Sequence, residues 1–150
     1  MQTINTSNLN EARKQIQELK KENKEIAVIS KDEDFNRKIL EIKGINLFVV
    51  DEKGIGKDSL KQRNSQLNQV LCKMAKKNDI SIGINFEEIS KLEKKQKVVA
   101  IARLVQNIKL CRKNKNKIII LPKNKYQKQD ILGFLIALKS STQQAKLSFD

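Results

Sequence analysis

A chain of 150 residues with 39% apolar residues is long enough to bury one hydrophobic core, so residues 1–150 are expected to form a single domain. The chain has 31 lysines and arginines against 17 acidic residues, a formal net charge of +14, and it contains no histidine. These values exclude a histidine general base and a histidine metal ligand.

In the first half of the chain, short apolar runs alternate with amphipathic stretches. The spacing of apolar residues predicts a helix over Asn8–Asn23, a strand over Glu25–Ser30, a helix over Asp34–Ile42 and a strand over Ile45–Asp51. A long loop, Glu52–Asn64, follows the second of these strands.

The second half continues the alternation. We predict a helix over Ser65–Asn78, strands over Ile80–Phe86 and Lys117–Pro122, helices over Lys97–Asn114 and Asp130–Leu138, and a fifth strand over Ala145–Phe149. In the long helix we expect an inward stripe and an outward basic side. The inward residues are Val98, Ile101, Ala102, Val105 and Ile108, and the outward ones Arg103, Lys109 and Arg112.

Continuous apolar strands separated by amphipathic helices are typical of a parallel sheet that helices cover. The sequence therefore predicts an α/β fold of alternating βα units. Two architectures remain open from the periodicity, namely a doubly wound open sheet and part of a β/α barrel. An eight-unit barrel needs about 200 residues or more, so a barrel formed by this chain would be shortened or partial.

The positive charge is concentrated in the second half of the chain. Residues 1–58 contain eleven basic and eleven acidic residues, whereas Lys91–Lys128 contains thirteen basic residues and one acid, Glu93. This uneven distribution indicates one electropositive face, the usual footprint of a protein that binds a polyanion. Aromatic residues make up only 4% of the chain. A surface on which the bases of a single strand stack one after another is therefore a poor explanation of the basic half. Phosphate contacts to a structured RNA fit the composition better.

The cysteines and the apolar runs bear on the cellular compartment. Cys72 and Cys111 lie in apolar helical stripes without CxxC spacing, so we expect reduced core residues rather than a disulfide or a metal site. The apolar run Ile118–Leu121 is too short to cross a bilayer, and the N-terminus lacks the pattern of a signal peptide. We therefore expect a cytoplasmic protein that has no membrane partner.

Acidic residues at strand ends are the available catalytic candidates. Asp51 and Glu52 follow the second predicted strand, and Glu87 and Glu88 follow the third. A carboxylate set that binds magnesium is conceivable there, but adjacent acids on a loop are more often solvated or cap a helix. We therefore assign no catalytic residue, no metal ligand and no cofactor to this chain.

The stretch "LNQVLCKMAKKNDISIGI" and the later "NIKLCRKNKNKIIIL" carry a family resemblance. They resemble the signature region of the ribonuclease P protein component 3 family, the subunit of the archaeal and eukaryotic enzyme that has a TIM-barrel-like fold. The matching positions are Leu67, Asn68, Val70, Leu71, Lys73, Asn78, Gly83, Ile84, Leu110, Arg112, Lys113 and Asp130, and "QAKLSF" resembles the closing strand of the family.

The chain also departs from the family pattern. Gln66 stands where the family usually has glycine and Gln69 where it has histidine, so a contact made by that histidine is in question here. The usual serines after the fourth strand are replaced by the run from Lys123 to Lys125. The chain is short for the family, which implies that a sheet edge stays open or that a partner closes it.

The resemblance implies a protein subunit of ribonuclease P, which assists removal of 5′ leaders from precursor tRNA by binding and stabilising the catalytic RNA. It implies three partners, the ribonuclease P RNA, precursor tRNA through the holoenzyme and a small partner protein subunit, with Mg²⁺ required by the RNA. The isolated chain is then expected to be non-catalytic. We predict RNA contacts at Lys57, Lys61, Arg63, Lys73, Arg103, Lys109, Arg112, Lys123 and Lys125.

Two alternatives remain open at this point. One is a basic α/β RNA-binding protein of another kind, such as a ribosome-associated factor. The other is a small barrel-like phosphohydrolase that acts through Asp51 and Glu87.

Overall fold

The computed structural model describes residues 1–51, 57–60 and 62–148, which form five strands and seven helices. In chain order these elements are β1 (Gln2–Ile4), α1 (Leu9–Lys21), β2 (Ile26–Ile29), α2 (Glu33–Leu40), β3 (Leu47–Val50), α3 (Gln69–Lys77), β4 (Ser81–Asn85), α4 (Phe86–Lys91), α5 (Lys94–Asn114), β5 (Ile118–Leu121), α6 (Lys128–Ala137) and α7 (Thr142–Leu147).

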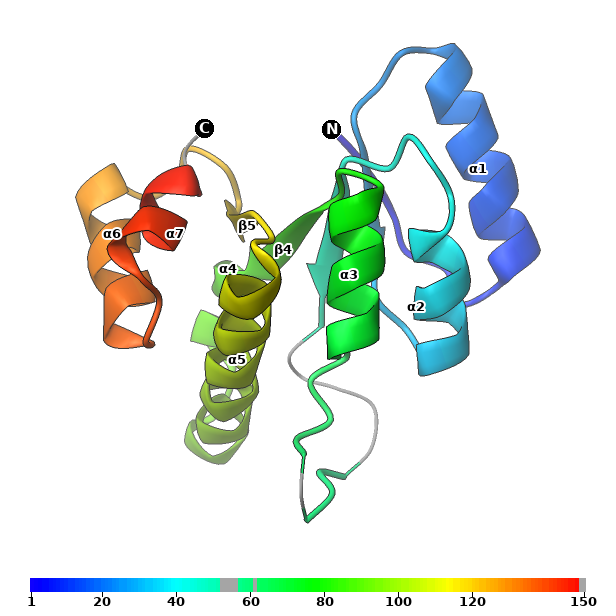
Figure 1. Cartoon of the computed structure of the whole chain (residues 1–150). Helices are drawn as coiled ribbons and strands as arrows, with labels where there is room; N and C mark the ends of the chain where they lie inside the picture. The colour runs from blue at the N-terminus through cyan, green and yellow to red at the C-terminus, as the bar shows by residue number, and fades with distance from the viewer. Residues whose placement is uncertain (52–56, 61, 149–150) are drawn as a thin grey trace.

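The five strands form one parallel sheet in the order β1-β2-β3-β4-β5. Because each strand pairs with the next along the chain, right-handed crossovers place all connecting helices on one face. Figure 1 shows α1, α2, α3 and α5 side by side on that face. The fold is therefore an open α/β sheet compatible with part of a β/α barrel. The doubly wound alternative is excluded, because its strand order reverses at the middle of the sheet.

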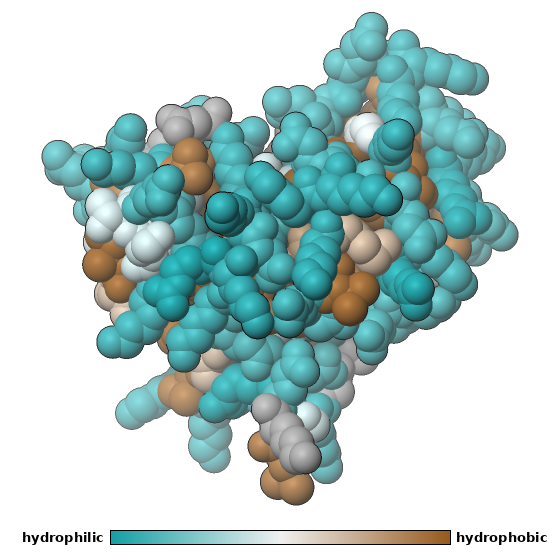
Figure 2. Space-filling model, viewed as in Figure 1, coloured by the Kyte–Doolittle hydropathy of each residue, from teal (hydrophilic) through white to brown (hydrophobic). Residues whose placement is uncertain are grey.

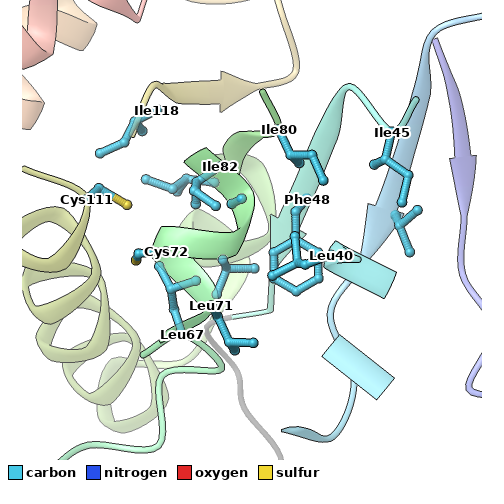
Figure 3. Close-up of a cluster of buried hydrophobic side chains, with 14 of the residues drawn as sticks. Leu40, Ile45, Phe48, Leu67, Leu71, Cys72, Ile80, Ile82, Cys111 and Ile118 are labelled. Carbon is cyan, nitrogen blue, oxygen red and sulfur yellow. The ribbon is translucent and has the colours of Figure 1, made fainter. Parts of the chain in front are cut away.

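The main core lies between the sheet and this layer of helices. Large side chains on the outer face of the strands, among them Phe48, Ile82 and Ile118, pack against α3 and α5 (Figure 3). Cys72 and Cys111 are free, buried thiols in the same cluster, which confirms the prediction of reduced core cysteines.

The inner face of the sheet carries a second, smaller apolar cluster. Ala27, Leu47 and Val49 are buried there. A Cβ atom added at Gly83 would lie 3.1 Å from Leu47 Cγ and 3.1 Å from Val49 Cγ2, so the neighbouring strand fills the space beside this glycine. The absence of a side chain at Gly83 allows the inner face to pack closely.

Helix starts follow the capping rules. The side chains of Asn8, Asp32, Asn68 and Ser141 each accept a hydrogen bond from a backbone N–H in the first turn of the helix that follows. Asp130, which we predicted to begin a helix, lies instead in the first turn of α6. None of the helices in the described ranges is long and apolar enough to span a membrane.

Two elements of the structure were not predicted, and one predicted element is wrong. β1 was not predicted, because three residues give too little alternation to identify a strand. α4 was not predicted either, because it follows β4 directly and has a single buried residue, Ile89. The strand predicted over Ala145–Phe149 is wrong for its described residues, since Ser141 caps a helix, α7, that runs to Leu147. Phe149 lies outside the described residues.

The predicted inward stripe of α5 is also largely wrong. Val98 is 65% exposed, and of the predicted inward residues only Ile108 is fully buried. The side of α5 that is buried is rotated relative to the predicted stripe. Its residues are Ala100, Arg103, Leu104, Asn107, Ile108 and Cys111. Apolar residues occur on several sides of α5, so the sequence did not identify which side faces the sheet.

Candidate nucleic-acid interface

The described part of the long loop is fastened to α5 through one carboxylate. Asp58 Oδ1 accepts a hydrogen bond from Arg103 Nε at 3.0 Å and from the backbone N–H of Asn64 at 2.7 Å, and its Oδ2 accepts one from Arg63 Nη1 at 3.3 Å. Burial alone would raise the pKa of Asp58. The Asn64 N–H and the two guanidinium groups outweigh it and hold that pKa below the ordinary 3.8. Asp58 is therefore a carboxylate at neutral pH.

Two amide side chains of α5 hold the next part of the same loop. Gln106 accepts a hydrogen bond from the backbone N–H of Arg63 at 3.1 Å, and it donates to the Arg63 carbonyl at 2.9 Å and to Ser65 Oγ at 2.8 Å. Asn107, which is buried, donates to the carbonyl of Ser65 at 3.1 Å. Together with Asp58, these contacts fix the loop against one side of α5.

The predicted outward position of Arg103 is wrong. Its side chain is only 4% exposed and is paired with Asp58. The loop covers the side of α5 on which Arg103 lies, and a helical projection of α5 alone could not reveal that cover. Arg103 therefore positions the loop and is not available to a phosphate while this pair exists.

The other predicted cations near this loop do face solvent. Arg63, Lys73, Lys109 and Arg112 are exposed, and so is Lys113, which we did not predict. We call these five residues of the loop, α3 and α5 the α3–α5 face. Figure 1 shows the two helices side by side, and Figure 2 shows mostly hydrophilic side chains over them. Lys61 lies outside the described residues.

A groove of 580 Å³ runs along α5 within this face. Lys109 and Lys113 contribute positive charge to its lining, and Ala102 and Val105 contribute apolar atoms. Arg63 also lines it, but its pair with Asp58 partly offsets its charge. None of the described residues that line it is acidic. Positive charge on a firm helical support suits contacts with nucleic-acid phosphates.

Lys57 lies in a different electrostatic environment. It lines a pocket of 490 Å³ together with Arg63, and the same pocket is lined by Asp32 and Glu33 of the α2 start. The two acids offset the two basic residues here. This pocket is therefore a weaker candidate for phosphate contact than the groove along α5.

Lys123 and Lys125 follow β5 and make ion pairs of their own. Lys123 Nζ lies 3.7 Å from Glu25 Oε2, and Lys125 Nζ lies 3.1 Å from Glu87 Oε1. Hydrogen bonds from Lys91 and Lys125 lower the pKa of Glu87. The structure thus separates these two lysines from the α3–α5 face, although both are exposed.

Several positions of the family-like signature have structural roles in this chain. Asn68 caps α3, and its amide group also donates to Glu33 Oε1 at 3.1 Å. Asn78 donates to the carbonyl of Leu40 at 2.6 Å. Gln66 has a φ of 62°, a left-handed conformation that favours glycine. Gln69 is exposed at the start of α3.

The acidic residues of the hydrolase alternative are not brought together. Asp51 lines a pocket of 370 Å³ at the carboxyl ends of the strands, with Asn85 and Glu88. Glu87 does not line that pocket, and its carboxylate pairs instead with Lys91 and Lys125. Within the described ranges, no group of three or more His, Cys, Asp or Glu side chains could hold a metal ion.

Comparisons with known proteins identify the fold but no family. No protein-family model matches the sequence, and a search of curated proteins finds no match. One similar solved chain belongs to a cryo-EM structure of archaeal ribonuclease P with mature tRNA, with a TM-score of 0.76 and 17% sequence identity. The match covers 97% of this chain and 62% of that one, so this chain spans less than two thirds of its length.

Sequence reasoning missed the residues that hold the loop. Gln106 and Asn107 carry no motif, and only the fold shows that Arg63 and Ser65 lie against them. Lys113 could have been found, because it follows Lys109 by four residues and therefore lies on the same side of α5.

Proposed function

We propose that this chain is a protein subunit of a ribonuclease P ribonucleoprotein, in which it binds and stabilises the catalytic RNA during 5′-leader removal from precursor tRNA. The observation that carries the proposal is the fold likeness, which extends over 97% of the chain, to a chain of archaeal ribonuclease P. The family-like signature between Leu67 and Ile84 supports the same assignment independently of the fold.

The α3–α5 face is the RNA-binding surface in this proposal. Its cations come from two neighbouring helices and a loop that Asp58, Gln106 and Asn107 hold in place. A surface that is ordered before binding loses less conformational entropy when it meets RNA. Lys57, Lys123 and Lys125 are secondary contacts, because acidic neighbours offset their charge.

The chemistry belongs to the RNA and its Mg²⁺ in this assignment, and the isolated chain cleaves nothing. The protein partner is the small subunit of the same enzyme. Within the described residues, the edge strands β1 and β5 each have one side without a strand partner in the sheet, which is a further reason to expect association. Coexpression with that subunit should give a soluble heteromer by size-exclusion chromatography with light scattering.

Copurification tests the proposal directly. The tagged chain is expressed in the organism that naturally produces it. The RNA that remains bound after washing at moderate salt is then sequenced. Enrichment of ribonuclease P RNA and precursor tRNA is expected. Enrichment of ribosomal RNA would favour the ribosome-associated alternative, and a nucleic-acid-free protein with metal-dependent phosphatase activity would favour the hydrolase.

Two triple variants test whether the α3–α5 face binds this RNA, and the second is the control for the first. Replacement of Lys73, Lys109 and Lys113 with glutamine should reduce recovery of the RNA. The same number of replacements on α1, at Arg13, Lys14 and Lys21, should not, because that helix lies at the far edge of the helical layer from α5 (Figure 1).

A further inference from the structure

Helix α5 has a second apolar side, which faces solvent. Most of the residues that we predicted to face the core lie there, whereas the side that packs on the sheet is a different one. Val98 is 65% exposed and Val99 is 40% exposed, and two further apolar residues are partly exposed. Figure 2 shows a small hydrophobic area over the lower end of α5 among hydrophilic side chains. We call these four residues the α5 stripe, namely Val98, Val99, Ala102 and Val105.

The α5 stripe has the spacing of a helix that packs against another helix. Val98, Ala102 and Val105 follow one another at intervals of four and three residues, so they form one line along α5. At 3.6 residues per turn, this line lies opposite the side that includes Leu104 and Cys111, which are buried. Valine is also a weaker helix former than lysine or glutamine, so valines exposed on this side do not help α5 itself.

Lysines lie at both ends of the α5 stripe. Lys94 and Lys95 precede it by one turn, and Lys109 and Lys113 follow it and line the groove along α5. All four are exposed, and none of them makes an ion pair with another of the described residues. Helix α5 contains seven basic residues and no acidic one, so nothing on the helix itself offsets this charge. A partner that covers the stripe must therefore be acidic.

We propose that the α5 stripe docks an amphipathic helix of a partner protein, in which acidic residues flank the apolar ones. Apolar side chains of that helix, spaced at three and four residues, pack on the valines of α5. Its carboxylates pair with the lysines at the two ends of the stripe. This contact differs in kind from phosphate binding at the α3–α5 face, and it does not rest on the proposed RNA-binding function.

Two other occupants fit this surface less well. If two copies of the chain paired their stripes antiparallel about Ala102, Lys95 of one copy would face Lys109 of the other, because each lies seven residues from Ala102. Each copy also carries a net charge of +14. RNA would neutralise the lysines, but its phosphates would not cover the valines between them. An acidic amphipathic helix accounts for both parts of the surface.

Binding of designed peptides to the full-length protein tests the proposal. The first peptide has about 21 residues, or three heptads, with leucine at the core positions and glutamate beside them, which also keeps it from pairing with itself. The second has the same composition in scrambled order, and the third has lysine in place of glutamate. Fluorescence anisotropy of the labelled peptides gives the affinities. We expect the first peptide to bind about tenfold more tightly than the scrambled one, since burial of one aliphatic side chain changes affinity by about that factor. The lysine peptide should not bind.

Variants locate the contact on α5. Val98→Ser should weaken binding of the first peptide about tenfold. Val70→Ser is the matched control, because Val70 is 58% exposed on α3 and does not belong to the stripe. Both valines are largely exposed, so neither change should unfold the chain, and circular dichroism checks this. Replacement of Lys94 and Lys95 with glutamine should weaken binding about threefold at low salt and less at high salt.

Equal affinity for the first and the scrambled peptide would mean that the chain attracts acidic peptides through its overall charge, and it would overturn the docking proposal. An unchanged affinity in Val98→Ser would overturn it as well. If Val98→Ser instead weakens binding of a ribonuclease P RNA transcript about tenfold and leaves peptide binding unchanged, the stripe is part of the RNA contact. In that case the proposed function stands and the protein-docking inference fails.

Discussion

The guanidinium group of Arg103 on α5 lies 3.0 Å from the carboxylate of Asp58, measured from Nε to Oδ1, and joins two residues that are 45 positions apart. Only 4% of the Arg103 side chain and 23% of the Asp58 side chain is exposed. This pair determines how the long loop lies on α5, because Asp58 also binds Arg63 and the Asn64 backbone.

Removing the buried partner of this pair should destabilise the fold. Arg103→Gln leaves Asp58 with weaker donors, and we expect a loss of about 2 kcal/mol in the free energy of unfolding. This is less than for a fully buried pair, because Asp58 keeps some solvent contact. Urea denaturation measures the change. Lys109→Gln is the control on the same helix, and an equal loss in both variants would mean that the pair contributes nothing specific.

The fold class was predictable because it depends on repeated local patterns. β3 is a short apolar run, β4 alternates isoleucine with polar residues and glycine, and α3 carries a buried stripe that includes Leu71 and Ala75, so periodicity alone identified them. The choice between a barrel-like and a doubly wound sheet was not predictable, because it depends on strand order, which no local pattern encodes.

The candidate site was predictable in its charge but not in its geometry. Lys73, Lys109 and Arg112 are exposed as predicted. Arg103 was misjudged because a loop some 40 residues earlier covers it. The ring contacts of Phe86 with Tyr126 and Phe134 were not predicted, since Phe86 precedes both by 40 residues or more and meets them only in the folded chain.

The Asp58 carboxylate should make stability depend on acid pH. Its folded pKa lies below the ordinary 3.8, so at low pH the unfolded chain binds a proton that the folded chain does not, and the free energy of unfolding falls. The contribution is fully present above about pH 3.8 and is lost as the pH falls through the folded pKa. Urea midpoints of wild type and Asp58→Asn should therefore differ at pH 6 and approach each other as the pH falls below 3.8 and through the folded pKa. A difference that stays constant over this range would contradict the prediction.

Two glycines offer a matched test of the inner face. In Gly83→Ala the added Cβ would lie 3.1 Å from side-chain atoms of Leu47 and Val49, so we expect a loss of about 1–3 kcal/mol. Gly133 on α6 has no heavy atom within 4 Å of a built Cβ. Gly133→Ala should therefore stabilise the chain by about 0.5–1 kcal/mol, because alanine favours helix. Thermal and urea unfolding give both values, and a stable Gly83→Ala protein would show that the inner face is loosely packed.

The backbone at Gln66 should tolerate glycine and reject a β-branched residue. With φ at 62°, Gln66→Val is expected to cost about 1–2 kcal/mol. Gln66→Gly relieves the backbone but loses the contact between Asn36 Nδ2 and Gln66 Oε1, which is 3.3 Å long, so its net effect should be small. Urea unfolding of the two variants side by side tests this, and equal losses would indicate that the side chain at this position matters more than its backbone.

The α3–α5 face should dominate the salt dependence of RNA binding. Each phosphate that a lysine neutralises releases condensed counterions, so the slope of log affinity against log salt counts these contacts. Glutamine at Lys73, Lys109 and Lys113 should reduce the slope for a ribonuclease P RNA transcript by about two to three units. The α1 variant with Arg13, Lys14 and Lys21 replaced loses the same net charge, yet it should keep the wild-type slope. Equal slopes for both triple variants would mean that RNA responds to the overall charge of the chain, and the α3–α5 face would then have no special role.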